Sequence, residues 1–204
     1  MRDAPTPSRA RVVLGIDPGT AVTGYGIVRK EARNHLTLVE CGVIRTKPRD
    51  ALAQRLAEIH EGVAELIRRH SPDVLCIEDI FYARNVRTTV VLGHARGVIL
   101  LAGAQAGMEI HEFPPAEIKK AVAGSGAATK LQVQFMVARL LRLKSAPQPT
   151  DAADGVAAAL AFALAPDLPA VPGVELPDLR RLAREADAAG LVDIPGRVIG
   201  ARPG

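Results

Sequence analysis

The sequence has 204 residues, a length that suits one compact domain with short extensions and leaves little room for two. Hydrophobic residues make up 48% and charged residues 24%, which excludes a disordered or collagen-like chain. With four Phe, two Tyr and no Trp, the core must be aliphatic, and an RNA-binding module that stacks several aromatics is disfavoured.

Basic residues are in excess, and the excess is concentrated in one stretch. The whole chain has 26 Lys and Arg against 22 Asp and Glu, a net charge of +4. Residues 80–150 contain nine Lys and Arg but only three acidic residues. This distribution favours a polyanionic partner such as nucleic acid, with a solvated basic face as the alternative.

The two cysteines and the apolar runs indicate the cellular compartment of the protein. Cys41 and Cys76 lie in apolar runs without a CxxC spacing, which predicts reduced thiols rather than a zinc site. No secretory signal is recognisable, and the longest apolar runs are shorter than the roughly 20 residues that span a bilayer. We therefore expect a soluble, cytoplasmic protein with no membrane partner.

The first half of the chain predicts a sheet and one crossover helix. Residues 12–17 are an apolar run that ends in an acid, as expected for a buried central strand. Residues 22–30 and 36–46 predict two more strands, which with the first would form an antiparallel meander. Between residues 50 and 70, apolar side chains recur every three or four positions and predict an amphipathic helix.

The middle of the chain repeats the succession of strand and helix. Residues 73–78 are again an apolar run closed by an acid, which predicts a second buried strand. Residues 88–106 predict a helix that is apolar on nearly all sides, and this implies burial on more than one face, as at a subunit interface. Residues 108–113 predict a last strand.

The remaining predicted elements are helices, at residues 115–123, 129–144 and 150–165. Four prolines between residues 166 and 177 then change the character of the sequence. We therefore expect an N-terminal extension over residues 1–11, an α/β domain over residues 12–165 and a Pro-rich C-terminal tail over residues 166–204. The domain should be a mixed sheet with helices on both faces.

Four acidic residues stand where a fold of this kind binds ligands. If the two acid-ended strands are parallel neighbours, Asp17 and Glu78 emerge at the same edge of the sheet. Thr150 is the expected N-cap of the last helix, which places Asp151 and Asp154 on one face of its first turn. The alternative is that these acids only end strands and complement the helix dipole.

Four carboxylates that converge would repel one another, and divalent cations would resolve the repulsion. A set of ligands made only of oxygen suits Mg²⁺ or Mn²⁺ and does not suit zinc or copper. Two such ions, about 3.5–4 Å apart, can activate a water and stabilise the leaving oxygen in attack on a phosphodiester. The four acids therefore predict metal-assisted phosphodiester hydrolysis.

Five motifs occur in order over roughly residues 12–165: GIDPGTAVTGYGIV, CIEDIFYARN, LGHARGV, GSGAATKLQVQFMV and DAADGVAAAL. Together they resemble the RuvC family of Holliday-junction resolvases. The resemblance implies an RNase H-like fold, with a mixed five-stranded sheet flanked by helices on both faces. It also implies a homodimer that nicks two strands of a four-way DNA junction symmetrically in recombination and repair, with Mg²⁺ or Mn²⁺ as cofactor.

The resemblance also assigns roles to particular residues. The family's catalytic, metal-binding acids fall on the four carboxylates named above. Lys130 matches a catalytic lysine, and Phe81 matches an aromatic residue that disturbs base stacking, a core position being the alternative. The expected DNA-binding residues are Phe81, Arg84, Arg87, Lys119, Lys120 and Lys130. Residues 88–106 match the dimer helix, and the RuvA and RuvB branch-migration proteins are candidate partners.

Other functions remain open at this stage. Sugar kinases and actin-like ATPases also place Asp-x-Gly-Thr after a first strand, but they need a duplicated domain, for which 204 residues leave no room. A different RNase H-like nuclease that acts on RNA or an RNA–DNA hybrid would share the acids. A junction-binding protein without activity would share the basic segment.

Overall fold

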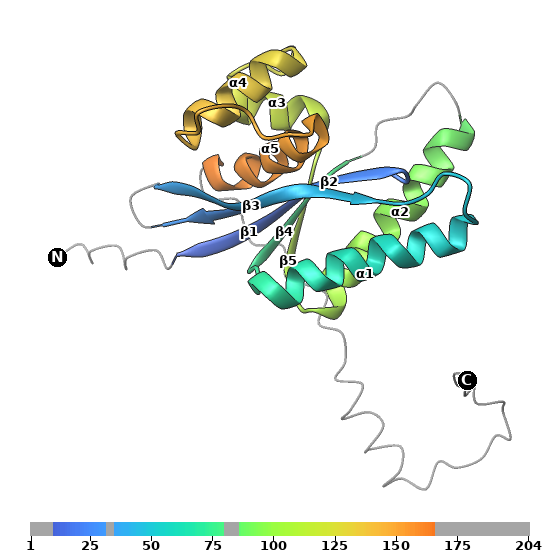
Figure 1. Cartoon of the computed structure of the whole chain (residues 1–204). Coiled ribbons are helices and arrows are strands. Elements are labelled where there is room, and N and C mark those ends of the chain that lie inside the picture. Colours follow the sequence, from blue (N-terminus) through green and yellow to red (C-terminus); the bar gives the residue numbers. More distant parts are fainter. Residues whose placement is uncertain (1–9, 32–34, 80–85, 166–204) are drawn as a thin grey trace, which may run out of the picture. The chain divides into compact units, whose positions relative to one another are not determined.

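The computed structural model describes residues 10–31, 35–79 and 86–165 (Figure 1). These residues belong to one compact unit, Met1–Val174. Their strands are β1 (Arg11–Asp17), β2 (Val22–Lys30), β3 (Leu36–Arg45), β4 (Val74–Glu78) and β5 (Glu109–Phe113), and their helices are α1 (Leu52–His70), α2 (Val86–Gln105), α3 (Pro115–Ala123), α4 (Lys130–Leu140) and α5 (Thr150–Leu164). The predicted tail over residues 166–204 and most of the N-terminal extension lie outside the described residues.

The strands form one mixed sheet in the order β3-β2-β1-β4-β5. β1 pairs antiparallel with β2, and β2 with β3, which confirms the predicted meander. β1 pairs parallel with β4, and β4 with β5. Ile16 lies opposite Ile77 across the parallel pair, so the next residues, Asp17 and Glu78, end the two strands at the same edge.

Helices cover both faces of the sheet, with α3, α4 and α5 on one side and α1 and α2 on the other (Figure 1). Because side chains alternate along a strand, Val74 and Cys76 of β4 pack towards α5, whereas Leu75 and Ile77 pack towards α1 and α2. The core is aliphatic, as the composition predicts. The same alternation turns Glu78 towards α5.

Helix α2 has one buried and one exposed face. Among the described residues, the buried face consists of Ala95, Ile99, Ala102 and Gly103. Val86, Val90 and Leu101 are 76%, 52% and 49% exposed. None of the described residues packs against that side of the helix, so the expected burial of a second face, as at a subunit interface, stays a prediction. None of the described helices has the length and apolar character needed to cross a membrane.

Candidate metal-dependent active site

The structure brings the four predicted carboxylates to one place. Asp17 ends β1, Glu78 ends β4, and Asp151 and Asp154 lie in the first two turns of α5. Carboxylate oxygens of Asp17, Asp151 and Asp154 lie within 4.8 Å of one another. Glu78 stands outside this group of three but lines the same cavity as Asp17 and Asp154. Two strand ends and one helix start therefore build a single acidic site.

Glycines on the sheet and on the helix let α5 come this close. A Cβ atom on Gly24 of β2 would lie 1.8 Å from the backbone oxygen of Asp151, and one on Gly155 would lie 2.5 Å from the Cα atom of Tyr25. The start of α5 thus rests directly on the backbone of β2. The predicted cap is wrong: Pro149 is the N-cap, and Thr150 is the first helical residue without a capping role.

The cavity at the acids has a volume of about 240 Å³. Its walls combine charged and apolar side chains from both strands and from α3, α4 and α5. The lining residues are Asp17, Glu78, Pro115, Ile118, Lys119, Lys130, Val133, Asp154 and Ala157. The apolar ones are absent from the sequence-based prediction, although Ile118 and Val133 could have been inferred from their place next to Lys119 and one turn after Lys130.

Two of the predicted lysines, Lys119 and Lys130, line the cavity, and the other two predicted DNA-binding residues that the structure describes, Lys120 and Arg87, do not. Lys130 donates a hydrogen bond of 2.6 Å from Nζ to Oδ2 of Asp154. This bond, helped by the charges of the neighbouring aspartates, raises the pKa of Lys130. Lys120 and Arg87 are exposed on α3 and α2. Phe81 and Arg84 lie outside the described residues.

The acids repel one another electrostatically, and the repulsion affects their pKa values. Burial, followed by the charges of Glu78, Asp154 and Asp151, raises the pKa of Asp17 to about 7, against a smaller opposing effect of Lys130. Burial and Asp154 raise the pKa of Glu78, while Lys119 and Lys130 oppose the rise. Two ammonium groups therefore do not neutralise the four acids. An all-oxygen donor set with unbalanced negative charge fits hard divalent cations such as Mg²⁺ or Mn²⁺.

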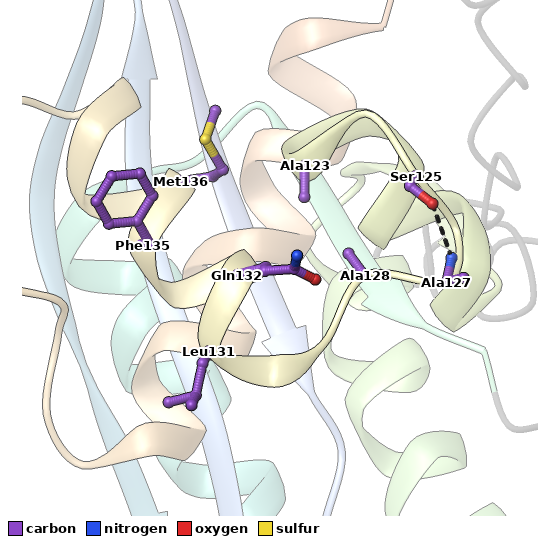
Figure 2. Close-up of a pocket in the computed structure, with 8 residues that line it drawn as sticks. All are labelled: Ala123, Ser125, Ala127, Ala128, Leu131, Gln132, Phe135 and Met136. Carbon is purple, nitrogen blue, oxygen red and sulfur yellow. Dashed lines mark hydrogen bonds between the residues drawn. The ribbon is translucent and has the colours of Figure 1, made fainter.

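Two larger hollows lie on the outer side of α4, away from the acids. Figure 2 shows the first, of about 570 Å³, between Ser125–Ala128 and the exposed side chains of Leu131 and Phe135. The second, of about 660 Å³, continues past Phe135 to Arg139 and Lys144. No carboxylate of the described residues lines either hollow, so they lack the oxygen ligands for a hard cation that the smaller acidic cavity offers.

Comparison with known proteins gives one family. The family model for "Crossover junction endodeoxyribonuclease RuvC" matches residues 13–162. A curated relative of that name from Pelotomaculum thermopropionicum is 47% identical over 152 residues, which cover 74% of this chain and 92% of the relative. One from Halorhodospira halophila is 50% identical over 151 residues, which cover 74% of this chain and 89% of the relative.

Solved structures agree with the sequence matches. A Thermus thermophilus RuvC structure has a TM-score of 0.70 and 36% identity, and one in complex with a Holliday junction substrate has 0.69 and 33%. Each match covers 75% of this chain and 93% of the other. The yeast mitochondrial Holliday junction resolvase, with a TM-score of 0.55 and 13% identity over 78% of this chain and 82% of that one, shares the fold. The predicted RNase H-like fold is thus confirmed, and the chain belongs to the RuvC family of crossover junction endodeoxyribonucleases.

Proposed function

We propose that this chain resolves four-way DNA junctions with two divalent metal ions held by Asp17, Glu78, Asp151 and Asp154. As a member of its family, it is an endodeoxyribonuclease that acts on Holliday junctions. The convergence of four carboxylates from two strand ends and one helix start is the observation that supports this use of the site.

The acids and the lysines have different roles in the site. Bound ions would activate a water and stabilise the departing oxygen of the phosphodiester. Asp17 lies close to the two aspartates of α5 and lines the same cavity as Glu78, so it is placed to share ions with both. Lys119 and Lys130 would offset the negative charge that develops on the phosphate, and Lys130 also orients Asp154.

The DNA would extend from the cavity to exposed basic residues on α3 and α2. Lys120 is exposed on α3, the helix that contributes Lys119 to the cavity wall, and Arg87 is exposed at the start of α2. Phosphate contacts from such residues would position the junction without reading its sequence. Phe81 and Arg84 keep their proposed DNA-binding roles on the resemblance alone, as do RuvA and RuvB as partners.

Function as a nuclease is tested by offering three substrates to the purified protein with Mg²⁺ or Mn²⁺. We expect a synthetic four-way junction to be cut at least about tenfold faster than linear duplex or RNA–DNA hybrid, because the site must meet phosphates of a branched backbone. Cutting should stop in a chelator, and binding should weaken as salt rises. Preferential cutting of the hybrid would contradict the proposal and identify a ribonuclease.

A homodimer formed through α2 is the second part of the proposal. Val86, Val90, Gly93, Gly97 and Leu101 follow one another at intervals of three or four and form an apolar stripe opposite the buried face of the helix. A Cβ atom on either glycine would meet none of the described residues within 4 Å. Two such stripes would bury apolar area and let helix backbones approach closely at the glycines. A two-fold dimer would carry two sites for the two strands of a junction.

The change Gly97→Glu should convert the dimer into monomers. The substitution adds a charged side chain to the middle of the stripe, yet its Cβ atom would meet none of the described residues within 4 Å, so folding should be unaffected. Sedimentation equilibrium of the variant is expected to show a monomer under conditions where the unchanged protein is a dimer. Ala57→Glu, on an exposed part of α1, makes the same change of charge and should stay dimeric. A dimeric Gly97→Glu protein would exclude this interface.

A further inference from the structure

Arg96 holds the site from the far side of the sheet. It lies on α2, and its Nη2 is 3.1 Å from Oδ1 of Asp79 and also pairs with Oε2 of Glu112. Its side chain is only 18% exposed, and its buried Nε has no hydrogen-bond partner among the described residues. A partly buried guanidinium that pairs with two carboxylates from different segments fixes those segments relative to each other.

The two carboxylates mark the ends of β4 and β5. Asp79 directly follows Glu78, and Glu112 directly precedes Phe113, the last residue of β5. The backbone N–H of Asp79 donates to the carbonyl of Phe113 over 2.8 Å, which continues the pairing of the two strands by one bond. Since Glu78 turns towards α5 and Arg96 comes from the α2 side, the guanidinium braces the strand end that carries Glu78 without entering the cavity.

We propose that Arg96 is a positioning residue, which fixes the end of β4 and thereby aims Glu78 at the metal site. This inference rests on the proposed function for the role of Glu78 as a ligand. Arg96 also directly precedes Gly97 of the proposed dimer stripe.

A second arginine of the chain provides a matched control for Arg96. Arg11 pairs with Glu109 at the opposite end of β5, where the N–H of Glu109 donates to the carbonyl of Asp73 over 3.3 Å. The two arginines thus pair with carboxylates at the two ends of the same pair of strands, and of the two only Arg96 lies beside the residue that follows Glu78. Asp79 and Glu112 are 45% and 48% exposed, so loss of Arg96 leaves no buried carboxylate without a partner, and Arg96→Met should fold.

Amide hydrogen exchange and Mn²⁺ binding test the role without measuring activity. In metal-free Arg96→Met, the amide of Asp79 should exchange at least about tenfold faster, while that of Glu109 is unchanged. Calorimetric Mn²⁺ affinity should fall about tenfold, with junction binding in chelator unaffected. Arg11→Met should speed exchange at Glu109 and leave Mn²⁺ affinity intact. Arg96→Lys keeps the positive charge but not the forked guanidinium group. Its exchange rate at Asp79 and its Mn²⁺ affinity should therefore lie between those of Arg96→Met and of the unchanged protein.

Unchanged exchange at Asp79 together with unchanged Mn²⁺ affinity in Arg96→Met would overturn the inference. If Arg96→Met fails to fold, unchanged exchange and unchanged Mn²⁺ affinity in Arg96→Lys would overturn it. An equal loss of Mn²⁺ affinity in Arg11→Met would also overturn it, because the effect would then come from general destabilisation. Failure of the unchanged protein to cut junctions, beside the expected loss of Mn²⁺ affinity, would instead remove the proposed function and leave the bracing intact.

Discussion

Replacement of Asp17 by asparagine should abolish junction cleavage and leave junction binding intact. Asp17 is the acid whose pKa is affected by all three of the others, so its carboxylate lies where shared ions would be held. Asparagine keeps the shape but offers a neutral ligand of lower affinity for hard cations. Loss of several kcal/mol of transition-state stabilisation corresponds to a fall of about 1000-fold or more in the single-turnover cutting rate.

The control for this substitution is Glu61→Gln, which removes one negative charge from an exposed position on α1. It should bind and cut like the unchanged protein. Gel-shift binding in the presence of Ca²⁺ and single-turnover cutting with Mg²⁺ separate the two properties. Cleavage by Asp17→Asn at the rate of the Glu61→Gln control would refute the role given to Asp17.

The same substitution should stabilise the metal-free fold at alkaline pH. The pKa of Asp17 rises from 3.8 to about 7 on folding. The stability contributed by the protonated carboxyl is thus fully present below pH 3.8 and is lost as the pH rises through about 7. Above that, the ionised group costs the folded state up to about 4 kcal/mol, which asparagine removes. Thermal unfolding in chelator should show the variant more stable at about pH 8.5 and the difference largely gone at about pH 4; parallel pH profiles would contradict this.

The strands and the acids could be predicted because both depend on local pattern. An apolar run that ends in an acid, found at Asp17 and again at Glu78, specifies a buried strand and the side chain at its end. The parallel placement of these strands agrees with what lies between them, because two antiparallel strands and a crossover helix together return the chain to its starting direction. The meeting of the two strand ends was thus accessible from periodicity and spacing.

The remaining features depend on packing between distant segments. The Arg96 brace joins α2 to two strand ends, and no short-range pattern relates Arg96 to Glu112. The hydropathy of α2 predicted burial on more than one face, but it does not distinguish contact within a chain from contact between chains, and the structure accounts only for the face buried within the chain. The Thr150 cap was wrong because the cap rule describes a local preference, and the start of α5 is instead held against β2 at Gly24.

Enlarging Gly15 should destroy both fold and site. A Cβ atom at this β1 position would lie 2.2 Å from the backbone nitrogen of Ala159 and 2.3 Å from the carbonyl of Gly155. Both atoms belong to the backbone of α5, which cannot move aside as a side chain can. The helix would have to lift off the sheet, exposing buried alanines and withdrawing Asp151 and Asp154 from Asp17. A Gly→Ala change ordinarily stabilises a strand by restricting the unfolded chain. At Gly15 the contact of the added Cβ atom with α5 reverses this effect, so the change should destabilise the fold.

We expect Gly15→Ala to lower the free energy of unfolding by about 3 kcal/mol or more, and Gly15→Val to leave no folded protein, since overpacking against backbone exceeds the usual cost of a core methyl group. Urea denaturation followed by circular dichroism measures the first, and the yield of soluble, junction-binding protein measures the second. Gly15→Ala should also lose Mn²⁺ affinity in the fraction that stays folded, because the ligands on α5 ride on the displaced helix. A stable Gly15→Val protein with full metal affinity would mean that α5 does not rest on β1. It would thereby contradict the geometry that brings the four carboxylates together.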